Sequence, residues 1–183
     1  MRGRVEAPGG CALLGQSPAD FLVRERVDEE LPGEAGRAAL EAVGLEGFAD
    51  RDPRDLSGGE RQRLALAITI AGPEREVAGL VALDEPTRGM DRSRKDDLAA
   101  LVGRLAARGA GVLVATHDVE FAAAFADRVV LLGDGVVIAD GPVAEVLSGG
   151  WYFATEVARI LGLPGVITPR SGAEALAAAG GRP

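Results

Sequence analysis

The sequence has little of several residue types: one cysteine, Cys11, one histidine, His117, and only 4% aromatic residues among its 183 positions. A single cysteine excludes an internal disulfide framework and is compatible with a reducing cytoplasm. No apolar run approaches the roughly 20 residues that cross a membrane. The start, MRGRVEAPGG, is positively charged but has no apolar signal-peptide segment. We therefore expect a chain that serves any membrane process from the surface.

Basic residues are outnumbered, because 20 lysines and arginines stand against 28 aspartates and glutamates, for a net charge of −8. A general nucleic-acid binder is more often basic, so we expect no nucleic-acid partner. The hydrophobic share of 47% and the charged share of 26% are ordinary for a globular protein. The length predicts one domain with a sizeable core and room for a small subdomain.

The sequence also lacks a phosphate-binding loop of the type G-x-x-x-x-G-K-[ST]. Its only lysine, Lys95, stands six positions after Gly89, but Arg94 replaces the second glycine and Asp96 replaces the hydroxyl residue. Lys95 also lies inside a predicted helix. The printed sequence therefore supplies no lysine and backbone cradle for phosphates.

Short apolar runs alternate with amphipathic segments along the chain. Strands are predicted at 11–15, at 79–83 and in GVLVATHD, and RVVLLGDGVVIADG predicts a hairpin with its turn at Asp134-Gly135. Helices are predicted within 24–45 with a break at Pro32-Gly33, after Ser57, and within 91–109, 119–126, 142–150 and 151–162, with a frayed tail from Ala175. Continuous apolar strands between helices indicate an α/β fold whose largely parallel sheet is covered on both faces.

Polar residues follow two of these strands, at the sheet edge where ligands bind in parallel α/β folds. Asp84 and Glu85 come after one apolar run, and Thr116 and His117 come after another. One carboxylate there can hold Mg²⁺, which takes one or two carboxylates plus phosphate oxygens, while its neighbour aims a water at a phosphorus. His117 would face the same crevice and donate to a phosphate oxygen or orient a water. The alternatives are a solvated acidic turn and a structural or merely exposed histidine.

The stretch DLSGGERQR places two glycines at the start of a predicted helix, although glycine is a poor helix former. Ser57 and Glu60 fit the capping box S-x-x-E, which leaves Gly58 and Gly59 unexplained. Glycines let an anion approach the backbone, and a helix start carries free N–H donors and partial positive charge. Ser57, Gly58 and Gly59 thus form a candidate phosphate site. The Glu60 carboxylate would oppose it unless it folds back on the cap or is offset by Arg61.

Four motifs together resemble those of ATP-binding-cassette (ABC) ATPases, in the family's order. LSGGERQRLALA resembles the signature motif, LVALDEPTRGMD the Walker B strand and D-loop, ATHD the H-loop and CALLGQSPAD the Q-loop strand. The segments GQSPADFLVRERVDEELP and EPTRGMDRSRKDDLAAL are similar to energy-coupling-factor (ECF) ATPases of vitamin and transition-metal uptake, most like the second cassette of fused two-cassette forms.

The resemblance implies a fold and a division of the chain. The fold is a partial P-loop NTPase-type parallel sheet flanked by helices, with a small α-helical signature subdomain. Residues 1–16 would be a remnant of the core that ends at the Q-loop, and 17–72 the helical subdomain. Residues 73–150 would form the α/β core with Walker B, D-loop and H-loop, and 151–183 a helical extension and tail.

The resemblance also assigns roles to residues of this chain. Asp84 would hold Mg²⁺ through water, Glu85 would polarise the attacking water, and His117 would contact the γ-phosphate of ATP. Gln16 would sense the γ-phosphate and Mg²⁺ near a transmembrane coupling subunit, and Asp91 would belong to the D-loop between cassettes. Ser57, Gly58, Gly59 and Glu60 would meet ATP held by a second cassette in a homo- or heterodimer.

The missing P-loop sets expectations for activity and stability. We expect the chain alone to have no significant ATPase activity, and to lie in the cytoplasm, peripheral on the inner face of the cell membrane. In the family the P-loop strand lies between the H-loop strand and the strand matching RVVLLG, so its absence predicts open edges and a partner-dependent fold.

Three interpretations of the whole chain remain open. It is the carboxy-terminal portion of an ECF-type ATPase, a non-catalytic partner that lends its signature helix, or a cassette outside transport. The third ranks lowest, because no long coiled-coil insertion is visible.

Overall fold

The computed structural model describes residues 6, 10–15, 22–71, 79–149 and 153–180. The chain divides into two compact units, Met1–Thr116 and His117–Pro183. Among the described residues, no helix has the length and apolar character needed to cross a bilayer. The four-part division predicted from the sequence stays a prediction.

The first unit contains a sheet of three parallel strands in the order β1-β2-β3. These are β1 (Cys11–Leu14), β2 (Leu80–Asp84) and β3 (Gly111–Ala115), each within three residues of its predicted bounds. The register places Leu13 beside Ala82 and Ala82 beside Leu113. The parallel pairing confirms the α/β fold, and it brings the carboxyl ends of β2 and β3 to one edge of the sheet.

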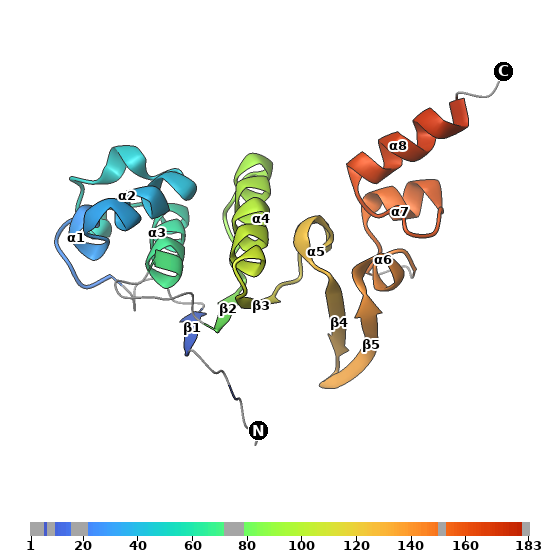
Figure 1. Ribbon diagram of the computed structural model, residues 1–183, viewed down its shortest axis with the longest axis horizontal. Coiled ribbons are helices and arrows are strands. Elements are labelled where there is room, and N and C mark those ends of the chain that lie inside the picture. The colour runs from blue at the N-terminus through green and yellow to red at the C-terminus, as the bar shows by residue number, and fades with distance from the viewer. Residues whose placement is uncertain (1–5, 7–9, 16–21, 72–78, 150–152, 181–183) are drawn as a thin grey trace. The chain divides into compact units, whose positions relative to one another are not determined.

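The helices of the first unit begin and end near the predicted positions. The break at Pro32-Gly33 separates α1 (Val27–Glu30) from α2 (Gly33–Ala42), since proline has no N–H to continue a helix. Two short 3₁₀ turns, Glu46–Phe48 and Pro53–Asp55, lead to α3 (Gly58–Ala71), and the loop after β2 leads to α4 (Arg92–Ala107). Helix α2 packs on α3, α3 contacts β1 and α4 contacts β3 (Figure 1).

The described part of this unit covers one face of the sheet, and the prediction of two covered faces stays a prediction. Ala12, Leu14, Val81 and Leu83 are each no more than 4% exposed. On the opposite face Leu13 is 59% exposed and Leu113 is 61% exposed. The continuous apolar runs predicted cover on both sides, but the helices that contact this sheet, α3 and α4, lie on one side of it (Figure 1).

The second unit begins with α5 (Val119–Phe125), followed by an antiparallel hairpin of β4 (Arg128–Gly133) and β5 (Val136–Pro142). Its turn is the predicted one, since Asp134 and Gly135 have φ of 50° and 77°. Helices α6 (Val143–Val146), α7 (Glu156–Leu161) and α8 (Pro169–Gly180) follow. Two expectations fail: Pro142 precedes α6 instead of starting it, and the tail is helical to Gly180, because its alanines favour helix.

Candidate functional site

Helix α3 begins at Gly58 with the predicted capping box in place. The Ser57 N–H donates to Glu60 Oε2 at 2.7 Å, and the Glu60 N–H donates to Ser57 Oγ at 3.3 Å. These two bonds satisfy donors that the helix itself leaves unpaired. The capping interpretation of Ser57 and Glu60 is confirmed.

The Glu60 carboxylate folds back on the cap, which was one of the two outcomes that the sequence left open. The hydroxyl and then the amide of Ser57 hold the pKa of this carboxyl below its usual value, with smaller contributions from the positive charges of Arg63 and Arg51. Glu60 is therefore a carboxylate at neutral pH, and one of its oxygens is engaged by the backbone in front of the helix.

The two glycines of the helix start have different surroundings. A Cβ on Gly58, which is exposed, would meet no atom within 4 Å. A Cβ on Gly59 would lie 3.3 Å from the carbonyl oxygen of Gly89, in the loop after β2. Gly59 thus has an internal packing reason to be glycine. Gly58 has none among the described residues, and the absence of a side chain there would let an anion approach its backbone.

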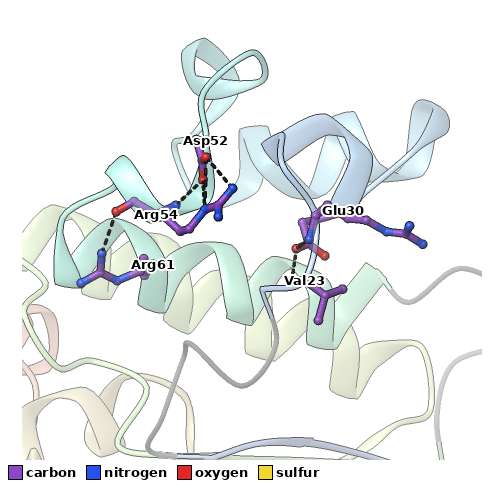
Figure 2. A network of polar contacts seen from close by, with 6 residues as sticks. Val23, Glu30, Asp52, Arg54 and Arg61 are labelled. Carbon is purple, nitrogen blue, oxygen red and sulfur yellow. Dashed lines mark hydrogen bonds and ion pairs between the residues drawn. The ribbon is translucent and has the colours of Figure 1, made fainter.

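Arg61 is held by the loop in front of α3. Its guanidinium donates to the carbonyl oxygens of Leu56 at 2.7 Å and Arg54 at 3.3 Å, and Figure 2 shows it reaching back from the helix. Arg54 pairs with Asp52 at 2.9 Å, and this pairing lowers the pKa of Asp52. These two hydrogen bonds of Arg61 hold the loop in place, and the sequence did not predict them because a long side chain can reach many acceptors.

Asp84 is the last residue of β2 and is half-buried, and Glu85 follows it in a left-handed conformation with φ of 48°. The Glu85 N–H donates to the Ala115 carbonyl at 2.8 Å, and Thr116 Oγ1 donates to Glu85 Oε2 across a long 3.5 Å contact. The two polar strand ends therefore meet at Glu85 and Thr116, as the parallel sheet predicted. Positive φ in a glutamate costs free energy and is typical of functional sites.

The loop after Glu85 turns tightly into α4. Met90 N–H donates to the Thr87 carbonyl at 3.0 Å, and Thr87 is buried. Asp91 Oδ1 accepts from the Arg94 N–H at 2.9 Å and so caps α4. The capping bond gives Asp91 a structural role, and its assignment to an interface between cassettes stays a prediction.

Two further predicted site residues are His117 and Gln16. His117 is exposed and starts the second unit, next to Asp118, whose Oδ1 accepts from Phe121 N–H at 3.0 Å and caps α5. Gln16 lies outside the described residues. The roles of both stay predictions.

Asp84 and Glu85 offer the hard oxygen donors that Mg²⁺ prefers. The described residues contain no group of three or more histidine, cysteine, aspartate and glutamate side chains that could hold a metal. Magnesium bound with phosphate needs only one or two carboxylates and keeps several waters. The donor set at the end of β2 therefore fits magnesium with a nucleotide better than a metal caged by protein alone.

Comparison with known proteins shows what this part of the chain resembles. Residues 6–88 match the model of the ABC transporter family. A putative ABC transporter ATP-binding protein of Streptomyces avermitilis is 43% identical over 174 residues, which are 90% of this chain and 30% of that protein. The chain thus spans about a third of this curated relative.

Two solved structures share the fold. The cbiO1 protein from Clostridium perfringens, described as part of the ABC transporter complex cbiONQ, gives a TM-score of 0.57 at 25% identity over 75% of this chain and 58% of that one. The archaeal ribosome recycling factor aABCE1, in complex with the stalk protein aP1, gives a TM-score of 0.63 at 27% identity. The match covers 78% of this chain and 31% of that one. These matches confirm the α/β fold with its parallel sheet and helices.

Proposed function

We propose that the chain is the signature-bearing portion of an ATP-binding cassette in an ECF-type importer of a vitamin or a transition-metal ion. The observation that carries the proposal is the start of α3, where Ser57 and Gly58 are exposed, precede 13 further helical residues, and leave room for a methyl group on Gly58. A helix start of this kind offers N–H donors and partial positive charge to a phosphate. The relative's name and the cbiO1 likeness support a transport role.

In this proposal ATP lies between two cassettes, and the γ-phosphate on a partner's P-loop meets Ser57, Gly58 and Gly59. The Glu60 carboxylate accepts from the Ser57 N–H, so the N–H groups of Gly58 and Gly59 are the ones that would meet the phosphate. Closure by α3 excludes water and orients the phosphate, so that the partner's own base acts on a positioned substrate.

The end of β2 carries the residues that would bind Mg²⁺ and activate water in a cassette that holds its own ATP. Asp84 would hold Mg²⁺ through water, and the ion would neutralise phosphate charge. The Glu85 carboxylate would take a proton from the water that attacks the γ-phosphorus, as the bond from phosphorus to the ADP oxygen breaks. Thr116 lies beside Glu85 Oε2 and would orient it. His117 would donate to the γ-phosphate, Gln16 would sense it, and Asp91 would lie between the cassettes.

The proposed partners follow from this arrangement. They are a second cassette, identical or different, and a transmembrane coupling subunit contacted near Gln16. The chain would then lie in the cytoplasm, on the inner face of the membrane. The S. avermitilis relative is matched over only 30% of its length, which leaves room for a second cassette in the same polypeptide.

Two alternatives share the same site. In one, the chain hydrolyses nothing and only lends α3 to a partner. In the other, it serves outside transport, which the likeness to the ribosome recycling factor aABCE1 favours. The transporter name of a relative at 43% identity weighs more than a structural likeness at 27% identity.

The test mixes the chain with an intact cassette that carries its own P-loop and measures steady-state ATP hydrolysis. We expect the chain to raise the rate, and Ser57→Arg to remove the increase by filling the space in front of α3. Ala178→Arg, which adds the same charge on exposed α8, should leave the increase intact. An increase that survives Ser57→Arg would contradict the proposal.

A further inference from the structure

A side chain of α5 bonds to the backbone at the start of α7. Glu120 Oε1, in the first turn of α5, accepts from the Glu156 N–H at 2.7 Å, although the two residues are 36 positions apart in the sequence. Glu156 is the first residue of α7, so its N–H has no acceptor within that helix. A hydrogen bond from an amide to a carboxylate is stronger than one between neutral groups. This Glu120–Glu156 link therefore joins α5 and α7 at their starts.

The Glu120 carboxylate lies at the positive ends of two helices. Glu120 is the second residue of α5, and its bond to Glu156 places it at the start of α7 as well. A negative charge is favourable at each of these positions. Asp118 already caps α5 and Thr155 already caps α7 through side-chain oxygens. The Glu120–Glu156 link is thus an addition to the two caps, and it connects the helices to each other.

An apolar contact holds the same two helices together. Ala123, one turn after Glu120, belongs to a buried cluster that also contains Ala158 of α7, and Val119 and Ala122 of α5 pack against this cluster. Residues three apart lie on the same side of a helix. The Glu120–Glu156 link and the apolar contact therefore act on neighbouring turns of α5, and together they restrict its rotation and sliding against α7.

The start of α7 is itself firmly anchored. Thr155 has an exposed fraction of 0% and Leu147 of 1%. The Thr155 N–H donates to the Leu147 carbonyl at 3.3 Å, and Thr155 Oγ1 accepts from the Ala158 N–H at 3.2 Å. Glu120, which is exposed, is therefore bonded to a residue that directly follows a buried and hydrogen-bonded one.

We propose that Glu120 is a positioning residue for His117, acting through its bond to the start of α7. His117 is exposed and directly precedes Asp118, the cap of α5. A rotation or shift of α5 would therefore move the backbone of His117 with it. The role of His117 toward a phosphate rests on the proposed function, whereas the link between Glu120 and α7 does not.

The experiment uses His117 as its own probe, because it is the only histidine of the chain. Imidazole signals of the full chain are recorded by NMR about two pH units above the usual histidine pKa, where the ring is neutral and a shift reports position and not charge. In Glu120→Ala these signals should move. Amide hydrogen exchange at residues 118–122 should rise about fivefold, as expected for the loss of one hydrogen bond.

Two control variants separate the link from charge and from general loosening. Glu120→Gln keeps an oxygen acceptor for the Glu156 N–H but loses the charge, and it should retain the parent signals of His117. Glu174→Ala removes another exposed glutamate of the same unit, one that accepts from Arg170 on its own helix α8 at 3.1 Å. It should leave His117 unchanged.

A second variant loosens the same link from the side of α7. Thr155→Val has nearly the same shape but lacks the oxygen that accepts from the Ala158 N–H. It should move the His117 signals in the same direction as Glu120→Ala. The double variant should add little to either change, because both substitutions release one contact. Circular dichroism should show that all variants fold.

Three results would overturn the inference. These are His117 signals that stay unchanged in Glu120→Ala, equal shifts in Glu120→Ala and Glu120→Gln, and equal shifts in Glu120→Ala and Glu174→Ala. Unchanged signals in a chain that still raises the ATPase rate of an intact cassette would contradict the positioning role alone. A chain that fails to raise that rate, but shows the predicted shifts, would contradict the proposed function and leave the link between Glu120 and α7 intact.

Discussion

Gly59 and Gly89 approach each other backbone to backbone, so that a methyl group on Gly59 would lie 3.3 Å from the Gly89 carbonyl oxygen. Gly59 belongs to the first turn of α3, and Gly89 belongs to the loop that runs from Glu85 to the α4 cap, Asp91. The start of α3, which is the candidate phosphate site, is therefore linked to the loop after Glu85 by a contact between two backbones. A change in one glycine is expected to affect both sites.

The two glycines of α3 should respond differently to alanine. Gly58→Ala should raise the free energy of unfolding by up to about 1 kcal/mol, because alanine favours helix and its methyl group meets open space. Gly59→Ala should give no gain, because the Gly89 carbonyl must move. Urea denaturation followed by circular dichroism measures both. Equal gains in stability for the two variants would show that a methyl group on Gly59 meets no steric resistance from Gly89.

The capping box should contribute measurably to stability. Ser57→Ala removes the oxygen that accepts from Glu60 N–H, and should cost about 1 kcal/mol. Ser57→Asp keeps an acceptor there and should retain most of the stability. Thermal unfolding compares the two variants, and an Ser57→Ala variant as stable as the parent would exclude the cap as a stabilising element.

Acid should loosen the start of α3. The lowered pKa of Glu60 means that its carboxylate stabilises the folded state above the usual carboxyl pKa, and that this contribution is lost as the pH falls through the lowered value. Amide exchange at residues 58–61 should therefore rise in acid relative to the rest of α3. Glu60→Gln should remove this pH dependence, and Glu41→Gln on α2 should not.

The isolated chain should show no metal-dependent ATP turnover, because its sequence has no P-loop to hold ATP beside Glu85. In the mixture with an intact cassette, Glu85→Gln should leave the increased rate unchanged, since the ATP lies on the partner. Turnover by the chain alone that Glu85→Gln abolishes would show that the chain holds its own nucleotide.

The backbone of Glu85 should be strained. Glu85→Gly should raise the free energy of unfolding by about 1 kcal/mol, because glycine accepts a φ of 48° without steric cost. Asp134→Gly, at a φ of 50° in the hairpin turn, is the matched control and should gain less, because aspartate tolerates this region better. Calorimetry measures the change in stability of both variants. A loss of stability in Glu85→Gly would show that the Glu85 side chain stabilises the fold by more than its backbone strain costs.

Local features of this fold could be predicted from the sequence. The strand bounds, the break at Pro32-Gly33, the Asp134-Gly135 turn and the capping box each depend on neighbours within a few residues. The position of Asp84 and Glu85 at the end of β2 could also be predicted, because they directly follow an apolar run that the sequence marks as a strand of a parallel sheet.

Other features depend on distant contacts that no local pattern reports. The left-handed φ of Glu85 accompanies its bond to the Ala115 carbonyl, and the partners of Arg61 follow from the path of the preceding loop. The exposure of Leu113 was missed because an apolar strand predicts burial, whereas burial requires another element to be present.

The central claim is that a partner holds ATP and that α3 closes over it. Its most direct test is the affinity of a fluorescent ATP analogue for an intact cassette whose own catalytic glutamate is replaced by glutamine. Adding this chain should tighten binding, Gly58→Ala should weaken that effect although it stabilises the fold, and Ser57→Arg should abolish it. Tight binding by the chain alone, or an effect that survives Ser57→Arg, would contradict the account.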